Sequence, residues 1–589
     1  MLRRSQALET LAGERFDVVV IGGGITGAGV ALDAATRGYS VALLEKADFA
    51  SGTSSRSSKL VHGGLRYLHQ FDLGLVREAL LERQLMVTLA PHLVRPLPLV
   101  VAAFDGARPD RLVGVGLNLY DVMSVDRRSA GERLRSRRGR RARGGDRAQG
   151  AGGPAAGEPG ERAGAANGGE SWSPERHRIV SGEEVAALLP ALAVREPSSG
   201  YLFYDCQTDD VRLVLTVLGE AERFGAVCAN RVEVSGLLEH EGRASGVSAV
   251  DAETGARLHV RAANVVNATG VWADELRPEE LHGEAELPRI RPSRGTHLTL
   301  RSSDLPLKAG AIVPAGQGRT IFALPWLGRT LVGTTDVDYD GPLEHVMPSH
   351  EDIEYLLSAV NEFFGTALGR DDLTGAFAGV RPLISTGDPK KSVDISRKAE
   401  LYETSSGMIT ITGGKLTTWR RMAKATVDRL VEREARDAPC RTQEIPLGAP
   451  VAVDELPTVE GVPSDSYPAL AARYGHAAHD VLALAAQRGE LAQPIVAGMP
   501  DLLAEVALAA SREQARSIGD VLLRRTRLGI LAARELLEDG AATPAGAPSA
   551  PVRRVAAVLA AELDWSQQRT ADELARFEQE ARAEGLLGS

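Results

Sequence analysis

The chain is poor in cysteine and contains no long apolar run. Its three cysteines, Cys206, Cys228 and Cys440, lie far apart among 589 residues, so they predict neither a disulfide framework nor a metal site and fit a reducing cytosol. No apolar run approaches the ~20 residues that span a bilayer, and the first six residues lack the apolar core of a signal peptide. We therefore expect a cytoplasmic protein, or one bound peripherally to the inner face of the cell membrane.

Basic charge is also scarce relative to acidic charge. The formal net charge is -10, which argues against general affinity for nucleic acid. Apolar residues make up 43% of the chain and charged residues 25%, as in ordinary globular proteins. The length allows two or more domains.

Residues 16–45 have the order strand, glycine-rich turn, helix, strand and acid. The run Phe16–Ile21 is apolar and rich in β-branched residues, which is typical of a buried strand. A helix is predicted for Ala28–Arg37 and a second strand for Ser40–Leu44. This order predicts a dinucleotide-binding unit of an α/β fold.

The turn is Gly22-Gly23-Gly24-Ile25-Thr26-Gly27. Gly22 permits the tight turn, Gly24 leaves room for a pyrophosphate, and Gly27 lets the helix lie close to the strand. The helix N-terminus offers free N–H groups to phosphates, and Glu45 can accept hydrogen bonds from a ribose. A turn without a ligand is a weaker explanation, because three glycines at a helix start cost stability.

Two further segments follow Glu45. Residues 46–59 are crowded with hydroxyls and glycine, so they can hold a second part of an elongated cofactor, although an ordinary surface loop has the same composition. The run Leu60-Val61-His62-Gly63-Gly64-Leu65-Arg66-Tyr67-Leu68 is more specific. A Gly-Gly pair beside His, Arg and Tyr indicates backbone close to a ligand, with polar groups converging on it.

These runs resemble the FAD-dependent glycerol-3-phosphate dehydrogenases, within the wider D-amino-acid oxidase and glycine oxidase-like flavoprotein group. The resemblance covers roughly residues 17–433 and implies a Rossmann-like FAD-binding domain with an interleaved antiparallel β-sheet substrate domain, then a helical C-terminal domain. It continues through Asn267-Ala268-Thr269-Gly270-Val271-Trp272-Ala273, Gly333-Thr334-Thr335-Asp336, Gly379-Val380-Arg381-Pro382-Leu383 and Gly413-Gly414-Lys415-Leu416-Thr417-Thr418.

The same resemblance divides the chain. An oxidoreductase region is expected at 1–445, with FAD-binding segments at about 16–125, 205–275 and 375–435 and substrate-domain segments between them. Residues 446–589 are expected to form the helical domain. The insertion 127–170 is rich in arginine and glycine and is predicted to be disordered.

Within the expected helical domain, residues 502–518 and 521–537 have the pattern of amphipathic helices. The pair Arg524 and Arg525 predicts a solvated or inter-domain face.

FAD fits the sequence better than NAD. The polar segment after Glu45 can follow an elongated cofactor, and no second Gly-x-Gly-x-x-Gly unit is present for a nicotinamide cofactor. The resemblance brings two later segments back to the same domain. The residues expected to contact FAD are Gly22, Gly24, Ile25, Thr26, Gly27, Glu45, Thr53, Ser54, Ser58, Lys59, Leu60, His62, Gly63, Gly64, Ala268, Thr269, Gly270, Gly414, Lys415, Leu416 and Thr417.

The substrate implied by the resemblance is sn-glycerol 3-phosphate, which is oxidised at C2 to dihydroxyacetone phosphate. Its phosphate needs fixed positive charge. Arg66 and Arg381 each offer a fork of donors and Lys415 a point charge, although any one of them is also typical of an ordinary salt bridge. Tyr67 is expected to contact the substrate or flavin, or only to pack.

A base must accept the proton of the C2 hydroxyl. His297 is the first candidate and His62 the second, because neutral imidazole suits this role near pH 7. A single histidine on a strand is, however, more often a packed core residue. Arg381 and Lys415 complete the predicted catalytic set, in which Lys415 stabilises the reduced flavin.

The resemblance implies a membrane quinone as electron acceptor, or oxygen in some members. Quinone use requires peripheral membrane contact, through a helix face or the arginine run 127–147. A homo-oligomer is compatible with the sequence.

Two other functions are considered. One is a related flavoprotein oxidase that uses oxygen on glycerol 3-phosphate, a 2-hydroxy acid or an amine. The other is an RNA- or membrane-binding protein that works through its arginine-rich insertion, against which the acidic net charge argues.

Overall fold

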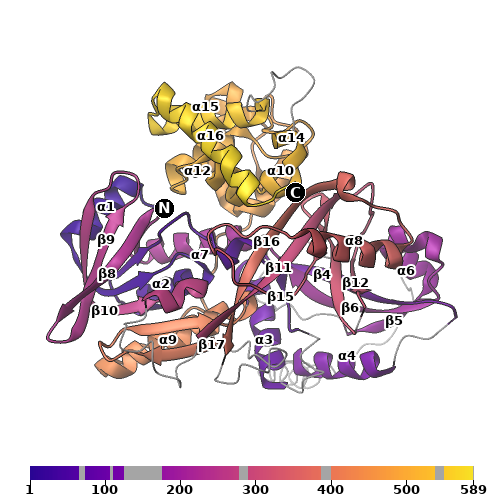
Figure 1. Cartoon of the computed structure of the whole chain (residues 1–589), viewed down its shortest axis with the longest axis horizontal. Coiled ribbons are helices and arrows are strands. Elements are labelled where there is room, and N and C mark those ends of the chain that lie inside the picture. The colour runs from indigo at the N-terminus through magenta and orange to yellow at the C-terminus, as the bar shows by residue number, and fades with distance from the viewer. Residues whose placement is uncertain are drawn as a thin grey trace, which may run out of the picture.

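The computed structural model describes residues 1–64, 73–106, 111–124, 176–276, 289–316, 318–385, 399–537 and 549–587. Two sheet-containing regions lie side by side, and a helical domain lies above the junction between them (Figure 1). The predicted disordered insertion 127–170 and the predicted substrate residues Arg66 and Tyr67 lie outside the described residues.

The first region is built on a sheet with a parallel centre. Within the described residues its strands have the order β17-β18-β10-β1-β2-β7, and antiparallel β9 and β8 extend from β10. The strands are β1 (Arg15–Ile21), β2 (Val41–Leu44), β7 (Val227–Ala229), β8 (Val232–His240), β9 (Arg243–Asp251), β10 (Arg257–Asn267), β17 (Ala399–Glu403) and β18 (Ile409–Gly413).

Both faces of β1 are covered, which explains its unbroken apolar sequence. Val18 and Val20 share a core cluster with α2, α7 and α9, whereas Val19 and Ile21 pack on the other face with α1. The predicted strand–helix–strand unit is confirmed, although the helix begins earlier than predicted. The four helices are α1 (Arg4–Gly13), α2 (Ile25–Thr36), α7 (Asp210–Arg223) and α9 (Trp419–Glu434).

The second region contains a mostly antiparallel sheet. The described strands have the order β15-β11-β14-β13-β12-β4-β6-β3, with β16 paired to β11 and β5 to β6. The strands are β3 (Leu60–Val61), β4 (Arg95–Ala103), β5 (Arg178–Ser181), β6 (Ser199–Gln207), β11 (Arg289–Arg301), β12 (Gly310–Pro314), β13 (Thr320–Trp326), β14 (Arg329–Gly333), β15 (Val337–Asp338) and β16 (Leu373–Ser385).

This topology narrows the expected FAD-binding segments. We expected 16–125 and 375–435 to belong to the cofactor domain, but β4 and most of β16 fall in those ranges and pair within the second sheet. The chain therefore crosses between the regions more often than the sequence indicates. The helices of this part are α3 (Leu73–Leu89), α4 (Arg111–Ser124), α6 (Gly182–Leu188) and α8 (His350–Phe364).

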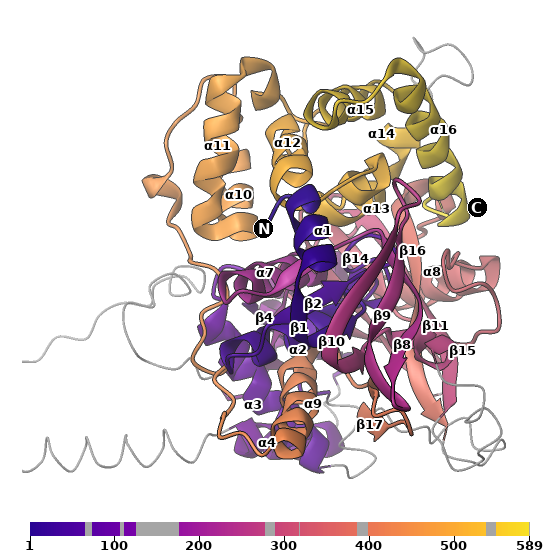
Figure 2. The same ribbon diagram turned by 90° about the vertical axis from the view of Figure 1, so that its left-hand side faces the viewer.

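The C-terminal domain is helical, and the turned view in Figure 2 again shows it above both sheets. Its helices are α10 (Ser466–Tyr474), α11 (Ala478–Gln487), α12 (Leu503–Arg512), a π-helical turn (Asp520–Arg525), α13 (Leu528–Leu531), α14 (Ala533–Leu537), α15 (Ala550–Leu563) and α16 (Gln567–Ala583).

The two helices predicted at 502–518 and 521–537 are both broken. Gln514 has φ 56° and Arg527 has φ 67°. A right-handed helix cannot continue through left-handed backbone, so the first helix ends before Gln514 and the second divides at Arg527.

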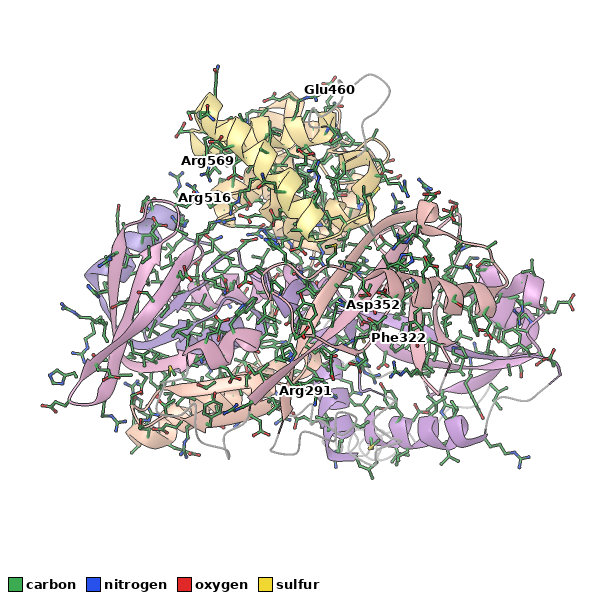
Figure 3. All side chains as sticks on the ribbon, in the orientation of Figure 1. Arg291, Phe322, Asp352, Glu460, Arg516 and Arg569 are labelled. Carbon is green, nitrogen blue, oxygen red and sulfur yellow. The ribbon has the colours of Figure 1, made fainter. Side chains whose placement is uncertain are left out.

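Arg524 and Arg525 join the helical domain to the first region. Both side chains are buried and form ion pairs with Asp48, at 2.7 and 2.6 Å. Their predicted inter-domain position is confirmed and the solvated alternative is wrong. Arg516 and Arg569, labelled in Figure 3, approach Glu253 of the β9–β10 turn at the edge of the same junction.

The apolar core is continuous across the junction. Leu97, Leu99 and Trp326 of the second sheet belong to one core cluster with Leu508 and Leu531 of the helical domain. The helical domain therefore shares a core with the second sheet. In the described part of the chain, no helix is both long and apolar enough to cross a membrane.

Candidate active site

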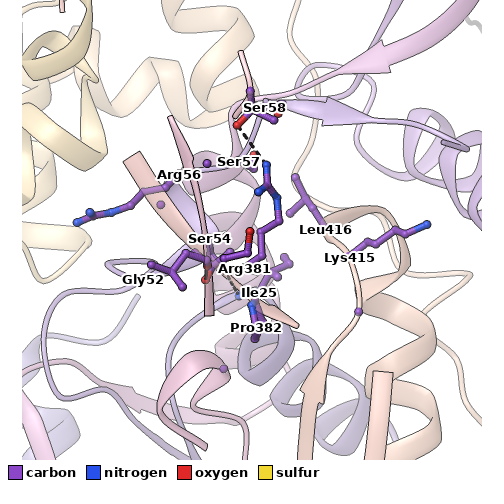
Figure 4. A pocket seen from close by; sticks show the side chains of 18 of the residues that line it. Ile25, Gly52, Ser54, Arg56, Ser57, Ser58, Arg381, Pro382, Lys415 and Leu416 are labelled. Carbon is purple, nitrogen blue, oxygen red and sulfur yellow. Dashed lines mark hydrogen bonds between the residues drawn. The ribbon is translucent and has the colours of Figure 1, made fainter. Parts of the chain in front are cut away.

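A cavity of about 1590 Å³ connects the glycine turn after β1 with the second sheet (Figure 4). It brings together segments that are up to several hundred residues apart in sequence. The predicted site residues on its wall are Gly22, Gly24, Ile25, Thr26, Glu45, Thr53, Ser54, Ser58, Leu60, His62, Gly64, Ala268, Thr269, Gly270, His297, Arg381, Gly414, Lys415, Leu416 and Thr417.

The glycine turn has the geometry that its sequence predicts. Gly22 has φ 108°, and a Cβ atom there would lie 2.7 Å from the carbonyl oxygen of Ala268. A Cβ atom at Gly27 would overlap the carbonyl oxygen of Gly22. Glycine at these two positions lets α2 start directly against β1 and β10. Gly27 therefore shapes the turn and does not itself line the cavity.

The N-terminus of α2 opens toward the cavity. Gly24 is the N-cap and supplies no side chain, while the N–H of Ile25 donates to Ser54 Oγ at 2.9 Å. Thr26, in the same first turn, also lines the cavity. Free N–H groups and the positive end of the helix dipole suit a phosphate at this place.

Glu45 lies at the end of β2 with 8% of its surface exposed. Its carboxylate accepts the N–H groups of Gly23 and Ala47 at 2.7 and 2.8 Å. Burial raises the pKa of Glu45, and these two hydrogen bonds oppose the rise. A carboxylate oxygen has two lone pairs, so Glu45 keeps acceptor capacity for ribose hydroxyls.

Lys59 and Gly63, both predicted to contact the cofactor, do not line the cavity. The ammonium of Lys59 is fully buried and donates to Asp210 at 2.8 Å and to the carbonyl of Ser55 at 2.6 Å. Gly63 donates its N–H to the hydroxyl of Tyr120 at 2.9 Å. Asp210 and Tyr120 come from distant parts of the chain, which sequence spacing does not reveal.

His297 is a deeply buried titratable group on the cavity wall. Its ring is 2% exposed, stacks on Phe377 with centroids 4.8 Å apart, and its Nε2 lies 2.9 Å from Ser58 Oγ. Burial lowers the pKa of His297 well below 6.5, and the charges of Lys59 and Arg381 add to the effect. The imidazole is therefore neutral near pH 7, as a proton acceptor must be.

His62 faces the same cavity from a different segment. The backbone N–H of His62 donates to Thr417 Oγ1 at 3.1 Å, and the Thr417 hydroxyl donates to the backbone carbonyl of His62 at 3.2 Å. The two bonds join the segment after β3 to the segment before α9. The structure thus brings the two candidate bases to one cavity.

Arg381 and Lys415 also line this cavity. The guanidinium of Arg381 donates to the Thr335 carbonyl at 3.0 Å and contacts Asp336 Oδ1 at 3.2 Å. A quarter of its side chain is exposed. One edge of the guanidinium is held by the 334–336 segment, which orients the group beside the cavity.

Several wall residues belong to runs that resemble the family, but no individual role was predicted for them. Ser57, Trp272 and Asp336 line the cavity. Trp272 lies under the ammonium of Lys46 at 4.3 Å and packs against Gly52. Asp336 belongs to a run whose resemblance we noted, but its ion pair with Arg381 depends on the pairing of β11 with β15 and β16.

The described residues fit FAD. The dinucleotide turn, His62 and His297 all line the same cavity, and its walls carry hydroxyls along 51–58. Gly24 places no Cβ atom at the helix N-terminus, and Trp272 Nε1 is buried without a hydrogen-bond partner among the described residues. Such a site offers donors to an elongated, phosphate-containing ligand.

Comparison with known proteins agrees with this geometry. Residues 17–429 match the family model described as FAD dependent oxidoreductase, and residues 409–570 match the model described as the C-terminal domain of alpha-glycerophosphate oxidase. Glycerol-3-phosphate dehydrogenase 2 of Mycobacterium tuberculosis (strain ATCC 25618 / H37Rv) is 36% identical, over 99% of this chain and 91% of the relative.

The chain belongs to the family of FAD-dependent glycerol-3-phosphate dehydrogenases. This confirms the resemblance, the predicted fold class and the predicted FAD dependence.

Other members of this dehydrogenase family agree in sequence and in fold. The aerobic glycerol-3-phosphate dehydrogenase of Bacillus subtilis (strain 168) is 35% identical, over 76% of this chain and 73% of the relative. The crystal structure of the glycerol-3-phosphate dehydrogenase from Bacillus halodurans complexed with FAD has a TM-score of 0.73 and 27% identity, and covers 99% of this chain and 97% of its own.

Proposed function

We propose that the protein oxidises sn-glycerol 3-phosphate at C2 to dihydroxyacetone phosphate, with FAD as cofactor. One observation carries the proposal: a cavity lined by a dinucleotide turn is also lined by two histidines and by the cationic side chains of Arg381 and Lys415. Relatives named glycerol-3-phosphate dehydrogenase at 35–38% identity support the same substrate.

Substrate binding is assigned to the cationic side chains. Arg381 is held by Asp336 and Thr335 and keeps donors beside the cavity, which suits a phosphate dianion. Lys415 adds a point charge from the segment before α9. Anchoring the phosphate places C2 at a fixed position in the cavity, so the binding energy is used to orient the reacting carbon.

Proton removal is assigned to His297 acting through Ser58. Ser58 lies on the cavity wall and contacts Nε2 of His297, so its hydroxyl can accept the C2 hydroxyl proton while it donates its own to the imidazole. When bound, FAD supplies the hydride acceptor. His62, whose segment lines the cavity directly, is the second candidate for the base.

The reaction is tested by anaerobic addition of glycerol 3-phosphate to the FAD-loaded protein. We expect the oxidised flavin absorbance to bleach, with one dihydroxyacetone phosphate formed per flavin. A bound flavin that bleaches with dithionite but not with glycerol 3-phosphate would contradict the substrate, and bleaching by a 2-hydroxy acid or amine would favour the related oxidase.

We further propose that the reduced enzyme passes its electrons to a membrane quinone, which requires contact with a membrane. The support is an apolar face of α4: Val115, Leu119 and Val122 are 67%, 37% and 71% exposed. Their spacing places them on one side of the helix. Val113, on the same helix, lines the cavity, so a lipid-soluble acceptor would reach the site from this side.

Vesicle sedimentation tests the membrane contact. We expect the Val115→Glu, Val122→Glu double variant to lose binding to lipid vesicles and turnover with a membrane quinone, while it keeps turnover with a water-soluble dye. Val194→Glu is the matched control, because Val194 is 77% exposed on another segment. Rapid re-oxidation by air, with no dependence on quinone or vesicles, would favour oxygen as acceptor.

A further inference from the structure

Residues 55–59 lie between the cavity and the helical domain. Ser57 and Ser58 line the cavity, and Ser58 contacts His297. Lys59, the next residue, turns its side chain the other way, into a buried ion pair. The position of Ser58 therefore depends on what holds its two neighbours.

Asp210, at the start of α7, binds this segment at three points. Its carboxylate accepts the N–H and the hydroxyl of Ser57, at 3.1 and 2.7 Å, and the ammonium of Lys59 at 2.8 Å. Asp210 is fully buried. Burial would raise its pKa, but the charges of Lys59 and Arg527 outweigh burial and lower it, so the carboxylate stays ionised and keeps all three bonds.

Arg527 brings the helical domain into the same group. Its guanidinium donates to the Ser55 carbonyl at 2.7 Å and to Asp210 Oδ1 at 3.2 Å. It is 1% exposed, lies 5.7 Å from the centre of the Trp326 ring, and also donates to the carbonyl of Leu523 at 3.1 Å. One nitrogen of the guanidinium, Nη2, thus links the carbonyl at the start of the segment with the carboxylate that holds its end.

The backbone at both ends of this contact is left-handed. Lys59 has φ 61° and Arg527 has φ 67°. Residues with a Cβ atom adopt this conformation at a cost, and they keep it where surrounding contacts determine it. The side chains of Lys59 and Arg527 share two acceptors, because both donate to the Ser55 carbonyl and to the carboxylate of Asp210.

We propose that Arg527 of the helical domain is a positioning residue for the oxidation: it fixes residues 55–59 through Ser55 and Asp210, and so holds Ser58 against His297. This rests on the proposed function, in which Ser58 and His297 take the substrate proton. The helical domain then completes the support of the active site and is more than an appended module.

The arrangement explains why the residue is an arginine. The guanidinium serves three partners with two nitrogens: Nη2 donates to the Ser55 carbonyl and to Asp210, while Nη1 donates to the Leu523 carbonyl. A lysine ammonium has a single nitrogen and lacks this planar spacing. The positive charge of Arg527 also matters, because the buried carboxylate of Asp210 forms ion pairs with both Lys59 and Arg527. Without Arg527, Lys59 still donates to the Ser55 carbonyl and to Asp210, but the carbonyl loses one of its two donors and the segment loses its anchor in the helical domain.

The test compares Arg527→Gln and Arg527→Lys with Arg534→Gln in the full-length, FAD-loaded protein. Arg534 is the matched control, because it also joins the helical domain to a strand segment, donating to the carbonyls of Leu373 and Arg370 at 2.9 and 3.1 Å. Hydrogen–deuterium exchange of peptides covering 53–60 reports the segment directly, since the Ser57 N–H donates to Asp210. Steady-state kinetics give kcat and KM separately.

For Arg527→Gln we expect exchange at 53–60 to rise while exchange in α10–α16 stays as in the wild type. We expect kcat to fall about tenfold with KM for glycerol 3-phosphate within about threefold. The exchange at 53–60 and the kcat of Arg527→Lys should lie between those of the wild type and of Arg527→Gln. Arg534→Gln should keep the wild-type values of both. In a Ser58→Ala background, Arg527→Gln should lower kcat by a further factor of less than about three, because both substitutions act on the same proton transfer to His297.

Unchanged exchange at 53–60 in Arg527→Gln would overturn the proposal, whatever the activity. So would an equal loss of kcat in Arg534→Gln, or full additivity with Ser58→Ala. If Arg527→Gln does not fold, the Arg527→Lys exchange result decides. If the wild type does not oxidise glycerol 3-phosphate, the proposed function fails but the exchange measurement still decides whether Arg527 holds the segment.

Discussion

His297 and Arg381 lie on one cavity but in different surroundings. His297 is enclosed by Phe377 and Ser58, whereas Arg381 keeps a quarter of its side chain exposed. The enclosed group has a strongly shifted pKa, and the exposed group offers donors to a ligand. These surroundings support the assignment of proton transfer to His297 and of phosphate binding to Arg381.

The pH dependence of kcat/KM follows from the pKa of His297. Burial lowers this pKa well below 6.5, and the charges of Lys59 and Arg381 lower it further. The imidazole is therefore neutral at pH 6.5 and above, and it is lost as a base only when the pH falls through the lowered pKa. We therefore expect kcat/KM to stay level down to pH 6.5 and to decrease only at pH values well below 6.5. Stopped-flow flavin reduction across the pH range measures this.

The variants His297→Gln and His62→Gln identify the group that titrates. Loss of the acid limb together with most of the reduction rate in His297→Gln agrees with the assignment, whereas the same result in His62→Gln alone would transfer the role to His62. An acid limb near pH 7 would instead indicate Lys59, whose pKa is lowered to about 7 by burial and by the charge of Arg527.

Arg381→Met should weaken recognition of the phosphate. Loss of a charge-assisted hydrogen bond costs about 1.5–3 kcal/mol, so we expect KM for glycerol 3-phosphate to rise about 10- to 100-fold. Glycerol lacks the phosphate and should be oxidised equally slowly by wild type and variant. An unchanged ratio of kcat/KM for the two substrates would remove Arg381 from phosphate binding, and Arg381→Lys tests whether charge alone suffices.

At the scale of elements, the start of α2 decides whether the cofactor domain forms a phosphate site. Gly27 sits where the first turn of the helix touches the turn after β1, and any Cβ atom there overlaps Gly22. The close contact keeps the helix N-terminus at the cavity wall. This arrangement depends on residue size and backbone conformation more than on charge.

Gly27→Ala should therefore push α2 away from β1. We expect a loss of about 1–3 kcal/mol in the free energy of unfolding and a lower ratio of bound FAD to protein. Gly219→Ala is the control, because Gly219 lies within α7 with open space around it, and alanine there should be neutral or stabilising by up to about 1 kcal/mol. Thermal unfolding and flavin absorbance provide both readouts, and equal effects of the two substitutions would contradict the close-contact argument.

At the scale of the whole molecule, buried charges and a shared apolar core join the helical domain to the two sheets. Asp48 is fully buried and binds Arg524 and Arg525 of the helical domain, at 2.7 and 2.6 Å. Asn230, before β8, also donates to Asp48 at 3.1 Å. One carboxylate thus holds three segments together, next to the loop that follows Glu45.

Asp48→Ala leaves two arginines without their buried partner. Removing one member of a buried ion pair costs about 3–5 kcal/mol, so we expect a clear fall in the thermal unfolding temperature and earlier proteolysis at the domain junction. Asp338→Ala is the control, because Asp338 is 58% exposed where it pairs with Arg291, and an exposed pair contributes about 1 kcal/mol or less. Similar unfolding temperatures for the two variants would show that the junction does not depend on Asp48.

The sequence by itself determined the cofactor unit and the type of reaction. Gly22, Gly27 and Glu45 could be assigned because local geometry requires them: a tight turn, a close helix and an acid at a strand end are all encoded within thirty consecutive residues. The later FAD segments and the substrate followed from resemblance to a family. The start of α7 is also a local feature, because its N-cap Asp209 accepts the N–H groups of Val211 and Arg212.

Only the tertiary structure decided which buried charges meet. Lys59 was expected to contact the cofactor, but its partner Asp210 is 151 positions away and Arg527 lies still further along the chain. The breaks at Gln514 and Arg527, and the membership of β4 in the second sheet, depend in the same way on contacts between distant segments. Hydrophobic periodicity and local motifs report on neighbouring residues, whereas the energy of a buried ion pair depends on where the fold brings its two charges.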